Sequence, residues 1–301
     1  MSNKIIGDNF IQRLEQLTFQ MQNPMRGFFG GNHRTNLNGQ NVEFADFKEY
    51  TLGDDIRHID WNLYSRFEKH YIKLFVDERQ MKVQIFIDGS ASMVKIDNNK
   101  REFALKAAIA IGYLAIHSLD KVSFHVMREN HSENIANTIT NKEAFFKAVT
   151  ELEETTFKGP TNINNAILNE INIGSNDGLT VIISDFMTDD WKKAVDYLRY
   201  KKRDVLLVQV LSQEDVNPFY SGRMRLLDSE ALDVLDEKNM QLRITKGHIK
   251  AYEMALNDFK EDIRKFAASR GIHYISVLSE EDILNFVFKR LGMVGLVKWH
   301  F

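Results

Sequence analysis

Hydrophobic residues along the chain follow two spacings, one typical of buried strands and one typical of helices. Short apolar runs at residues 83–87, 179–186 and 204–212 predict strands covered on both faces. Longer segments between and after them repeat their apolar residues at helical spacing. This alternation predicts an α/β fold with a mostly parallel central sheet and helices on both faces. The other predicted strands are 121–127 and 272–278, and the predicted helices are 100–118, 142–154, 162–171, 189–203, 250–271 and 280–292.

The first 80 residues follow a different pattern. Apolar residues recur at helical spacing over residues 9–22, which predicts a short amphipathic helix. Pro24 and a cluster of Gly and Asn then indicate a loop. Two extended runs follow within residues 70–89, the second of them being the strand at 83–87. We expect residues 1–80 to form an N-terminal segment that docks on a main domain spanning 81–301.

Residues 212–248 interrupt the alternation of the main domain. Their short hydrophobic runs are broken by a turn of the sequence Asp-Glu-Lys-Asn. Such a pattern predicts a small antiparallel β insertion, consisting of a hairpin with one extra strand.

Composition narrows the possible partners and compartments. The 301 residues are 44% hydrophobic and 27% charged with a formal charge of −3, which does not favour disorder or nucleic-acid binding. Cysteine is absent, so any metal must be held by oxygen or imidazole, and a reducing compartment is favoured. No stretch reaches the ~18 apolar residues of a membrane span, and the first residues are typical of a helix rather than a signal peptide. We expect a cytoplasmic protein without direct membrane insertion.

Oxygen-bearing side chains follow the predicted strands where ligands usually bind. Asp88, Ser90 and Ser92 come directly after the first strand of the main domain, Thr161 opens a helix, and Asp185 ends another strand. Carboxyl ends of parallel strands share one edge of a sheet, so these residues are expected to converge. Such a set suits Mg²⁺ or Mn²⁺, with a water position that a carboxylate from a partner could take. A strand-to-loop turn for the first three residues, and a helix cap for Thr161, are the structural alternatives.

The same five residues, in this order, resemble the metal-ion-dependent adhesion site of von Willebrand factor A domains. A second motif lies upstream and consists of Gly53, Asp54, Asp55, Arg57, Ile59, Asp60, Trp61 and Arg66. This motif resembles the signature of the bacterial DUF58 family, with Lys48 and Ser65 as departures that do not touch the metal site. The resemblance covers the chain from about Gly30 onward, and implies a von Willebrand factor A-like fold. It also implies a MoxR-type AAA+ ATPase as partner, with the protein as adaptor or co-chaperone.

The sequence leaves alternatives open both for the motif around Trp61 and for the function of the whole protein. The motif around Trp61 suggests a structural network in which Asp carboxylates pair with Arg57 or Arg66, although catalysis by His58 and Asp60 is the alternative. For the whole protein, the alternative to an interaction module is a metal-dependent phosphohydrolase with Asp88 as nucleophile. An aspartyl phosphatase requires a second carboxylate two residues later, and this chain has Ser90 there.

Overall fold

The chain forms two compact units, Met1–Phe19 with Met81–Phe301 as the main unit and Gln20–Gln80 as the second unit. The expected boundary near residue 80 coincides with one of these limits. The first residues, however, group with the main unit and not with residues 20–80. The computed structural model describes residues 8–15, 17–19, 42–51, 54, 56–77, 80–94, 99–170, 173, 178–188, 191–218, 222–226 and 240–299.

A six-stranded sheet in the order β11-β8-β7-β4-β5-β6 forms the centre of the main unit. All neighbouring strands are parallel except β6, which runs antiparallel to β5 at the edge. This mostly parallel sheet with its flanking helices confirms the predicted von Willebrand factor A-like fold class. The strands are β4 (Lys82–Asp88), β5 (Lys121–Met127), β6 (Ser132–Ile139), β7 (Leu179–Ser184), β8 (Asp204–Leu211) and β11 (His273–Leu278).

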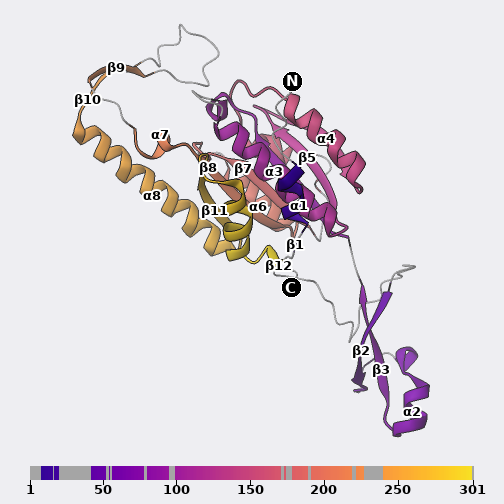
Figure 1. Ribbon diagram of the computed structural model, residues 1–301. Coiled ribbons are helices and arrows are strands. Elements are labelled where there is room, and N and C mark those ends of the chain that lie inside the picture. The colour runs from indigo at the N-terminus through magenta and orange to yellow at the C-terminus, as the bar shows by residue number, and fades with distance from the viewer. Residues whose placement is uncertain are drawn as a thin grey trace. The chain divides into compact units, whose positions relative to one another are not determined.

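Helices cover both faces of this sheet, as Figure 1 shows. The central helix α3 is almost wholly buried, which explains why its sequence is apolar on nearly every side. On the other face, Phe86 and Ile182 of the sheet pack in one core cluster with Trp191 and Ile263. The helices are α3 (Asn99–His117), α4 (Lys142–Glu154), α5 (Ile163–Leu168), α6 (Lys192–Tyr200), α8 (Lys246–Arg270) and α9 (Ile283–Asn285), followed by the π-helix η3 (Phe286–Leu291).

The N-terminal helix is shorter than predicted, because a strand replaces its second half. α1 (Asp8–Leu14) ends where β1 (Leu17–Phe19) begins, and β1 pairs antiparallel with β12 (Val297–Trp299). The expected helix over 9–22 is therefore wrong at Leu17–Phe19, and residues 20–22 lie outside the described residues. A strand of this length depends on a partner from the far end of the chain, which helical periodicity cannot reveal.

Side chains also tie this N-terminal segment to the main unit. Leu14 is fully buried. The Glu15 carboxylate accepts hydrogen bonds from the Tyr113 hydroxyl at 2.7 Å and from the Lys142 ammonium at 2.8 Å. These contacts explain why α1 and β1 belong with the sheet.

The second unit is an antiparallel pair of strands with two short helices between them. β2 (Val42–Glu49) pairs with β3 (Tyr71–Asp77), and η1 (Ile56–His58) and α2 (Trp61–Phe67) lie between them in the chain. Its docking on the main unit stays a prediction.

A small hairpin interrupts the main unit between β8 and α8. After α7 (Gln213–Val216), β9 (Gly222–Leu226) pairs antiparallel with β10 (Met240–Ile244), which confirms the predicted antiparallel insertion. Among the described residues of 212–248 there is no third strand, and 219–221 and 227–239 lie outside them. Within the described part of the chain, no helix is both long and apolar enough to span a membrane.

Candidate metal centre

The predicted metal ligands lie at the point where the sheet reverses its winding. From β4, the chain adds β5 and β6 on one side, and then returns to add β7, β8 and β11 on the other. Ligands of open α/β sheets bind at such a switch point, outside the carboxyl ends of the strands. Asp88 is the last residue of β4, and Asp185 follows the last residue of β7.

Hydrogen bonds join four of the five predicted ligands into one network. Asp88 accepts from the Ser90 amide at Oδ1 (3.0 Å) and from the Ser184 hydroxyl at Oδ2 (2.6 Å). The Ser90 and Ser92 hydroxyl oxygens lie 2.9 Å apart. Ser92 then donates to Oδ2 of Asp185 at 3.0 Å. Residues from two strand ends are thus brought together as the sequence predicted.

Thr161 shares a backbone acceptor with the loop after β4, because the Gly89 amide also donates to the Met127 oxygen, and no described hydrogen bond joins Thr161 to the other four residues. Its hydroxyl donates to the main-chain oxygen of Met127 at a long 3.4 Å, and Met127 is the register partner of Asp88 on β5. The structural alternative for Thr161 is wrong, because Asn162 caps α5 by accepting from the Asn165 amide at 2.8 Å. The Thr161 hydroxyl is therefore not needed as a helix cap.

The backbone holds the loop after β4 against the loop before α5. The Lys158 amide donates to the Gly89 oxygen, and the Ala91 amide donates to the Gly159 oxygen, each at 2.9 Å. A Cβ on Gly89 would lie 2.6 Å from Val126 Cγ1, a distance that real Cβ atoms do not show. Glycine is therefore required between the ligands Asp88 and Ser90.

The electrostatics of the centre favour a cation. Asp88 is only 4% exposed, and this burial, together with the nearby charge of Asp185, raises the pKa of its carboxyl group. Hydrogen bonds from Ser184 and Ser90 lower this pKa in part. Two buried carboxylates repel one another, and a positive charge between them relieves that repulsion.

One residue of the centre was not predicted. The ammonium of Lys100, in the first turn of α3, lies 3.0 Å from Oδ2 of Asp185 and 3.1 Å from Oδ2 of Asp215. Lys100 is only 7% exposed. Its burial alone would lower the pKa of the ammonium, but Asp185 and Asp215 outweigh this effect and the pKa is raised. The sequence carries no signal for this role, because a Lys near a helix start is normally a surface residue.

The chemistry of the donor set fits a hard divalent cation. Carboxylate and hydroxyl oxygens are the ligands that Mg²⁺ and Mn²⁺ prefer. Asp88, Ser90, Ser92, Thr161 and Asp185 would hold the ion. Among the described residues, no group of three or more His, Asp or Glu side chains could hold a metal, so an ion at this centre would depend on the hydroxyl oxygens as well as on the two carboxylates.

The same geometry does not favour Asp88 as a nucleophile. Both of its carboxylate oxygens accept hydrogen bonds, and the side chain is buried. A nucleophile has to reach the substrate atom that it attacks. The phosphohydrolase alternative therefore gains no support from this arrangement.

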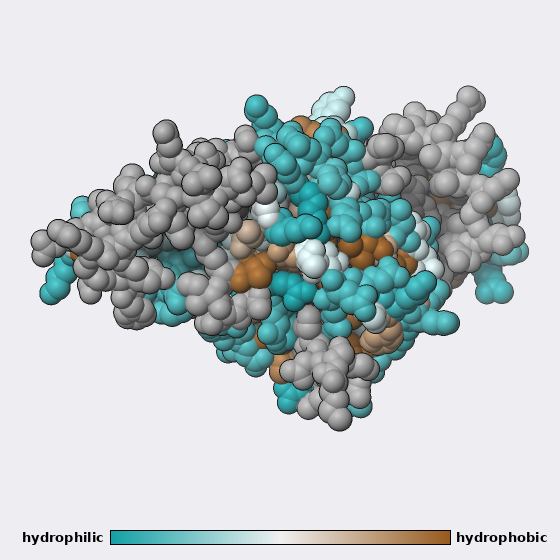
Figure 2. All heavy atoms as spheres, turned by 90° about the horizontal axis from the view of Figure 1, so that it is seen from above, coloured by the Kyte–Doolittle hydropathy of each residue, from teal (hydrophilic) through white to brown (hydrophobic). Residues whose placement is uncertain are grey.

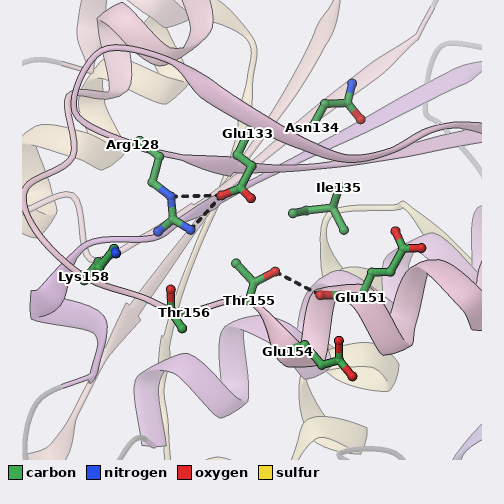
Figure 3. A pocket seen from close by; sticks show the side chains of 9 residues that line it. All are labelled: Arg128, Glu133, Asn134, Ile135, Glu151, Glu154, Thr155, Thr156 and Lys158. Carbon is green, nitrogen blue, oxygen red and sulfur yellow. Dashed lines mark hydrogen bonds and ion pairs between the residues drawn. The ribbon is translucent and has the colours of Figure 1, made fainter.

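An open cavity of about 560 Å³ adjoins the loop after β4 (Figure 3). Arg128 borders both features, since it donates to the Gly89 oxygen at 3.2 Å and pairs with Glu133 at 2.9 Å. Small-molecule pockets are mostly apolar, whereas only one lining side chain here is apolar. The lining residues are Arg128, Glu133, Asn134, Ile135, Glu151, Glu154, Thr155, Thr156 and Lys158.

The described surface that faces the top of Figure 1 is also largely polar. Figure 2 shows this face, on which hydrophilic residues predominate among the described atoms. Hydrophobic atoms form small groups near the middle of this view. Such a surface suits a polar contact that can form and dissociate more than a permanent hydrophobic one.

The upstream motif builds the second unit. Asp60 caps α2 by accepting from the Asn62 amide at 2.8 Å, and Asp54 pairs with Lys48 at 3.1 Å. Thr51 also donates to Asp54 through its amide and its hydroxyl. These contacts give Asp54 and Asp60 structural roles. Gly53 and Asp55 lie outside the described residues, as does the side chain of His58.

The aromatic part of the motif lies on the surface of this unit. Trp61 is 63% exposed, and its ring makes edge contacts with the rings of Tyr64 and His70. Arg57 and Arg66 are exposed as well. The pairing of Asp carboxylates with Arg57 or Arg66 stays a prediction.

Comparison with known proteins adds a family and distant relatives. The family model described as "Protein of unknown function DUF58" matches residues 46–254. The uncharacterized protein Rv1480 of Mycobacterium tuberculosis is 21% identical over 227 residues, covering 72% of this chain and 70% of its own. An uncharacterized protein of Mycobacterium bovis, Mb1516, matches to the same extent.

Similar solved structures include a bacterial protein and a VWA domain. The conserved hypothetical protein BatB from Bacteroides thetaiotaomicron is 14% identical, with a TM-score of 0.42 over 71% of this chain and 98% of its own. The VWA domain of SpRpn10 is 10% identical, with a TM-score of 0.39 over 70% of this chain and 95% of its own.

Proposed function

The chain belongs to the DUF58 family, and on that premise we propose that it is a metal-dependent protein-interaction module. Mg²⁺ or Mn²⁺ binds at the centre formed by Asp88, Ser90, Ser92, Thr161 and Asp185. A carboxylate of a partner protein completes the coordination of the ion. The module acts as an adaptor or co-chaperone of a MoxR-type AAA+ ATPase.

One observation carries the metal part of this proposal. The hydroxyls of Ser90 and Ser92 bridge from the end of β4 to the Asp185 carboxylate. An aligned set of small oxygen donors at a switch point provides ligands without filling the space that the ion and its waters need. With only two carboxylates among the ligands, the ion keeps its affinity for a further negative group.

The surroundings of the metal centre favour a protein partner over a small-molecule substrate. The neighbouring cavity is open and polar, which disfavours an enclosed small-molecule substrate. A single Asp or Glu side chain reaching the ion requires no deep pocket. The assignment to a MoxR-type ATPase rests on the family resemblance, and the absence of cysteine in this chain favours a reducing compartment such as the cytoplasm.

Thermal denaturation with and without metal tests the centre. A ligand that binds only the folded state raises the melting temperature, so excess Mg²⁺ or Mn²⁺ should stabilise the wild type relative to chelator. Asp88→Ala should lose this response. Asp258→Ala, which removes an exposed carboxylate of α8, should keep it.

A binding assay tests the partner. We expect an immobilised MoxR-type ATPase to retain the wild-type protein in Mg²⁺, to release it in chelator, and not to retain Asp88→Ala. Retention that is equal in metal and chelator would contradict a metal-bridged contact. Turnover of phosphate esters that is lost in Asp88→Asn would instead establish the hydrolase.

A further inference from the structure

The ammonium of Lys100 contacts Asp185, one of the two carboxylates that are proposed to bind the metal ion. It is buried and lies 3.0 Å from Oδ2 of Asp185, the same oxygen that accepts from Ser92. Burying an ammonium is costly unless carboxylates compensate it. The structure provides two, Asp185 inside the centre and Asp215 outside it.

A bound divalent ion and the Lys100 ammonium would both contact the carboxylate of Asp185. The ion alone would balance the two negative charges of Asp88 and Asp185, and Asp215 would balance the ammonium. With an ion bound, Lys100 is therefore a third positive charge that Asp185 does not need. Like charges at contact distances in a buried site repel strongly, so the ion and the ammonium cannot both hold Asp185 at full strength.

We propose that Lys100 is a tethered competitor of the metal ion, which neutralises Asp185 when no ion is present and is displaced from it when an ion binds. This inference deepens the proposed function and rests on the metal centre assigned there.

Asp215 makes such a displacement feasible. Its Oδ2 atom lies 3.1 Å from the ammonium and also accepts from the Ser212 amide at 2.9 Å, within the capping box that begins α7. Lys100 can therefore release Asp185 while keeping a carboxylate partner that is already in contact. The ammonium does not have to lose all of its charge compensation at once.

The competition has a consequence for the partner protein. A metal ion that must displace Lys100 binds weakly to the isolated module. A carboxylate from the partner adds a negative charge at the ion and shifts the balance away from the ammonium. By linkage, the ion and the partner then strengthen each other's binding to the same degree.

Calorimetric titration of the purified full chain with Mn²⁺ and Mg²⁺ tests the inference. We expect Lys100→Gln to bind the ion at least about tenfold more tightly than the wild type, because one repelling charge is removed. The melting temperature of Lys100→Gln should fall in chelator and recover with metal. Lys106→Gln is the matched control, since it removes the same charge from a more exposed position of the same helix.

The outcomes separate the inference from the proposed function. If the wild type and Lys100→Gln bind metal equally, or Lys100→Gln binds it more weakly, the competition is refuted and the metal centre stands. If neither binds metal, the metal centre itself is refuted, and the competition with it.

A second variant covers the case that Lys100→Gln does not fold. Asp215→Asn removes the alternative partner from a partly exposed position, so Lys100 should hold Asp185 more firmly. We expect metal affinity to fall by about threefold or more. An unchanged affinity in Asp215→Asn would contradict the displacement.

Discussion

Ser92 and Asp185 lie 93 positions apart in the chain and are joined by a hydrogen bond of 3.0 Å between the hydroxyl and the carboxylate. This bond connects the turn after β4 with the residue after β7. Together with the hydrogen bond from the Ser184 hydroxyl to Asp88, it links the ends of the two strands at the switch point. The hydroxyl is also one of the proposed ligands, so a single atom serves both the geometry of the centre and its metal chemistry.

Removal of this hydroxyl should weaken metal binding more than it weakens the fold. We predict that Ser92→Ala lowers the affinity for Mn²⁺ by about tenfold, whereas the free energy of unfolding in chelator falls by about 1 kcal/mol, the usual size of one lost hydrogen bond. Titration calorimetry and urea denaturation measure the two quantities. Ser269→Ala near the end of α8 removes an exposed hydroxyl that bonds only locally and should change neither.

The two carboxylates of the centre should respond oppositely to neutralisation. Asp88 has a raised pKa because of its burial and of Asp185, so its charge destabilises the fold without metal. We predict that Asp88→Asn has the same or a higher melting temperature than the wild type in chelator. Asp185→Asn should melt lower, because it weakens the compensation of the buried Lys100.

Both variants should lose the stabilisation by metal, which the same melting experiment measures. A fall in melting temperature for Asp88→Asn as large as that for Asp185→Asn would contradict the charge distribution described for the centre.

Stability should depend on pH through Asp120, away from the metal centre. Burial raises the pKa of this carboxyl group to about 6, despite a hydrogen bond from the Met81 amide at 2.8 Å. The folded state therefore holds a proton between its usual pKa of 3.8 and about 6 that the unfolded state has lost. Stability from this group is full below that range and falls as the pH rises to about 6.

Asp120→Asn should remove this contribution to the pH dependence. We predict that the difference in unfolding free energy between the variant and the wild type grows by about 2 kcal/mol from pH 4 to pH 7, in favour of the variant. Urea denaturation across this pH range measures it. A constant difference across the range would show that Asp120 ionises normally in the folded protein.

Gly89 should tolerate no side chain. An added Cβ would lie 2.6 Å from both Val126 Cγ1 and Arg128 Nη1, and 2.8 Å from the Met127 oxygen. We predict that Gly89→Ala costs about 2 kcal/mol of stability and abolishes the metal response, because the turn that carries Ser90 must shift. Gly247→Ala is the matched control, since its nearest contact would be an ordinary 3.6 Å and helix propensity favours Ala there.

The part of the centre that the sequence predicted consists of residues at strand ends. Asp88, Ser90, Ser92 and Asp185 each follow a hydrophobic run, so the rule that parallel strands share one edge was sufficient to bring them together. Lys100 follows no such rule. Its role depends on how α3 packs beside β7 and α7, and on the burial that results, which no local pattern encodes.

The elements that were missed share this non-local origin. β6 is a polar strand at the edge of the sheet, and its largely exposed residues give no hydrophobic alternation. β1 is defined only by its pairing with β12. The strands that were predicted are the buried central ones. Because both of their faces are covered, they appear in the sequence as nearly continuous hydrophobic runs.

The pairing of β1 with β12 also determines how force would pass through this molecule. Because the chain leaves the main unit after Phe19 and re-enters it at Met81, the second unit is anchored by two covalent connections. β4 begins directly after the second connection and ends in Asp88. A pulling force on the second unit would therefore reach the main unit through β1, which is held by β12, and through β4, which ends in the proposed ligand Asp88.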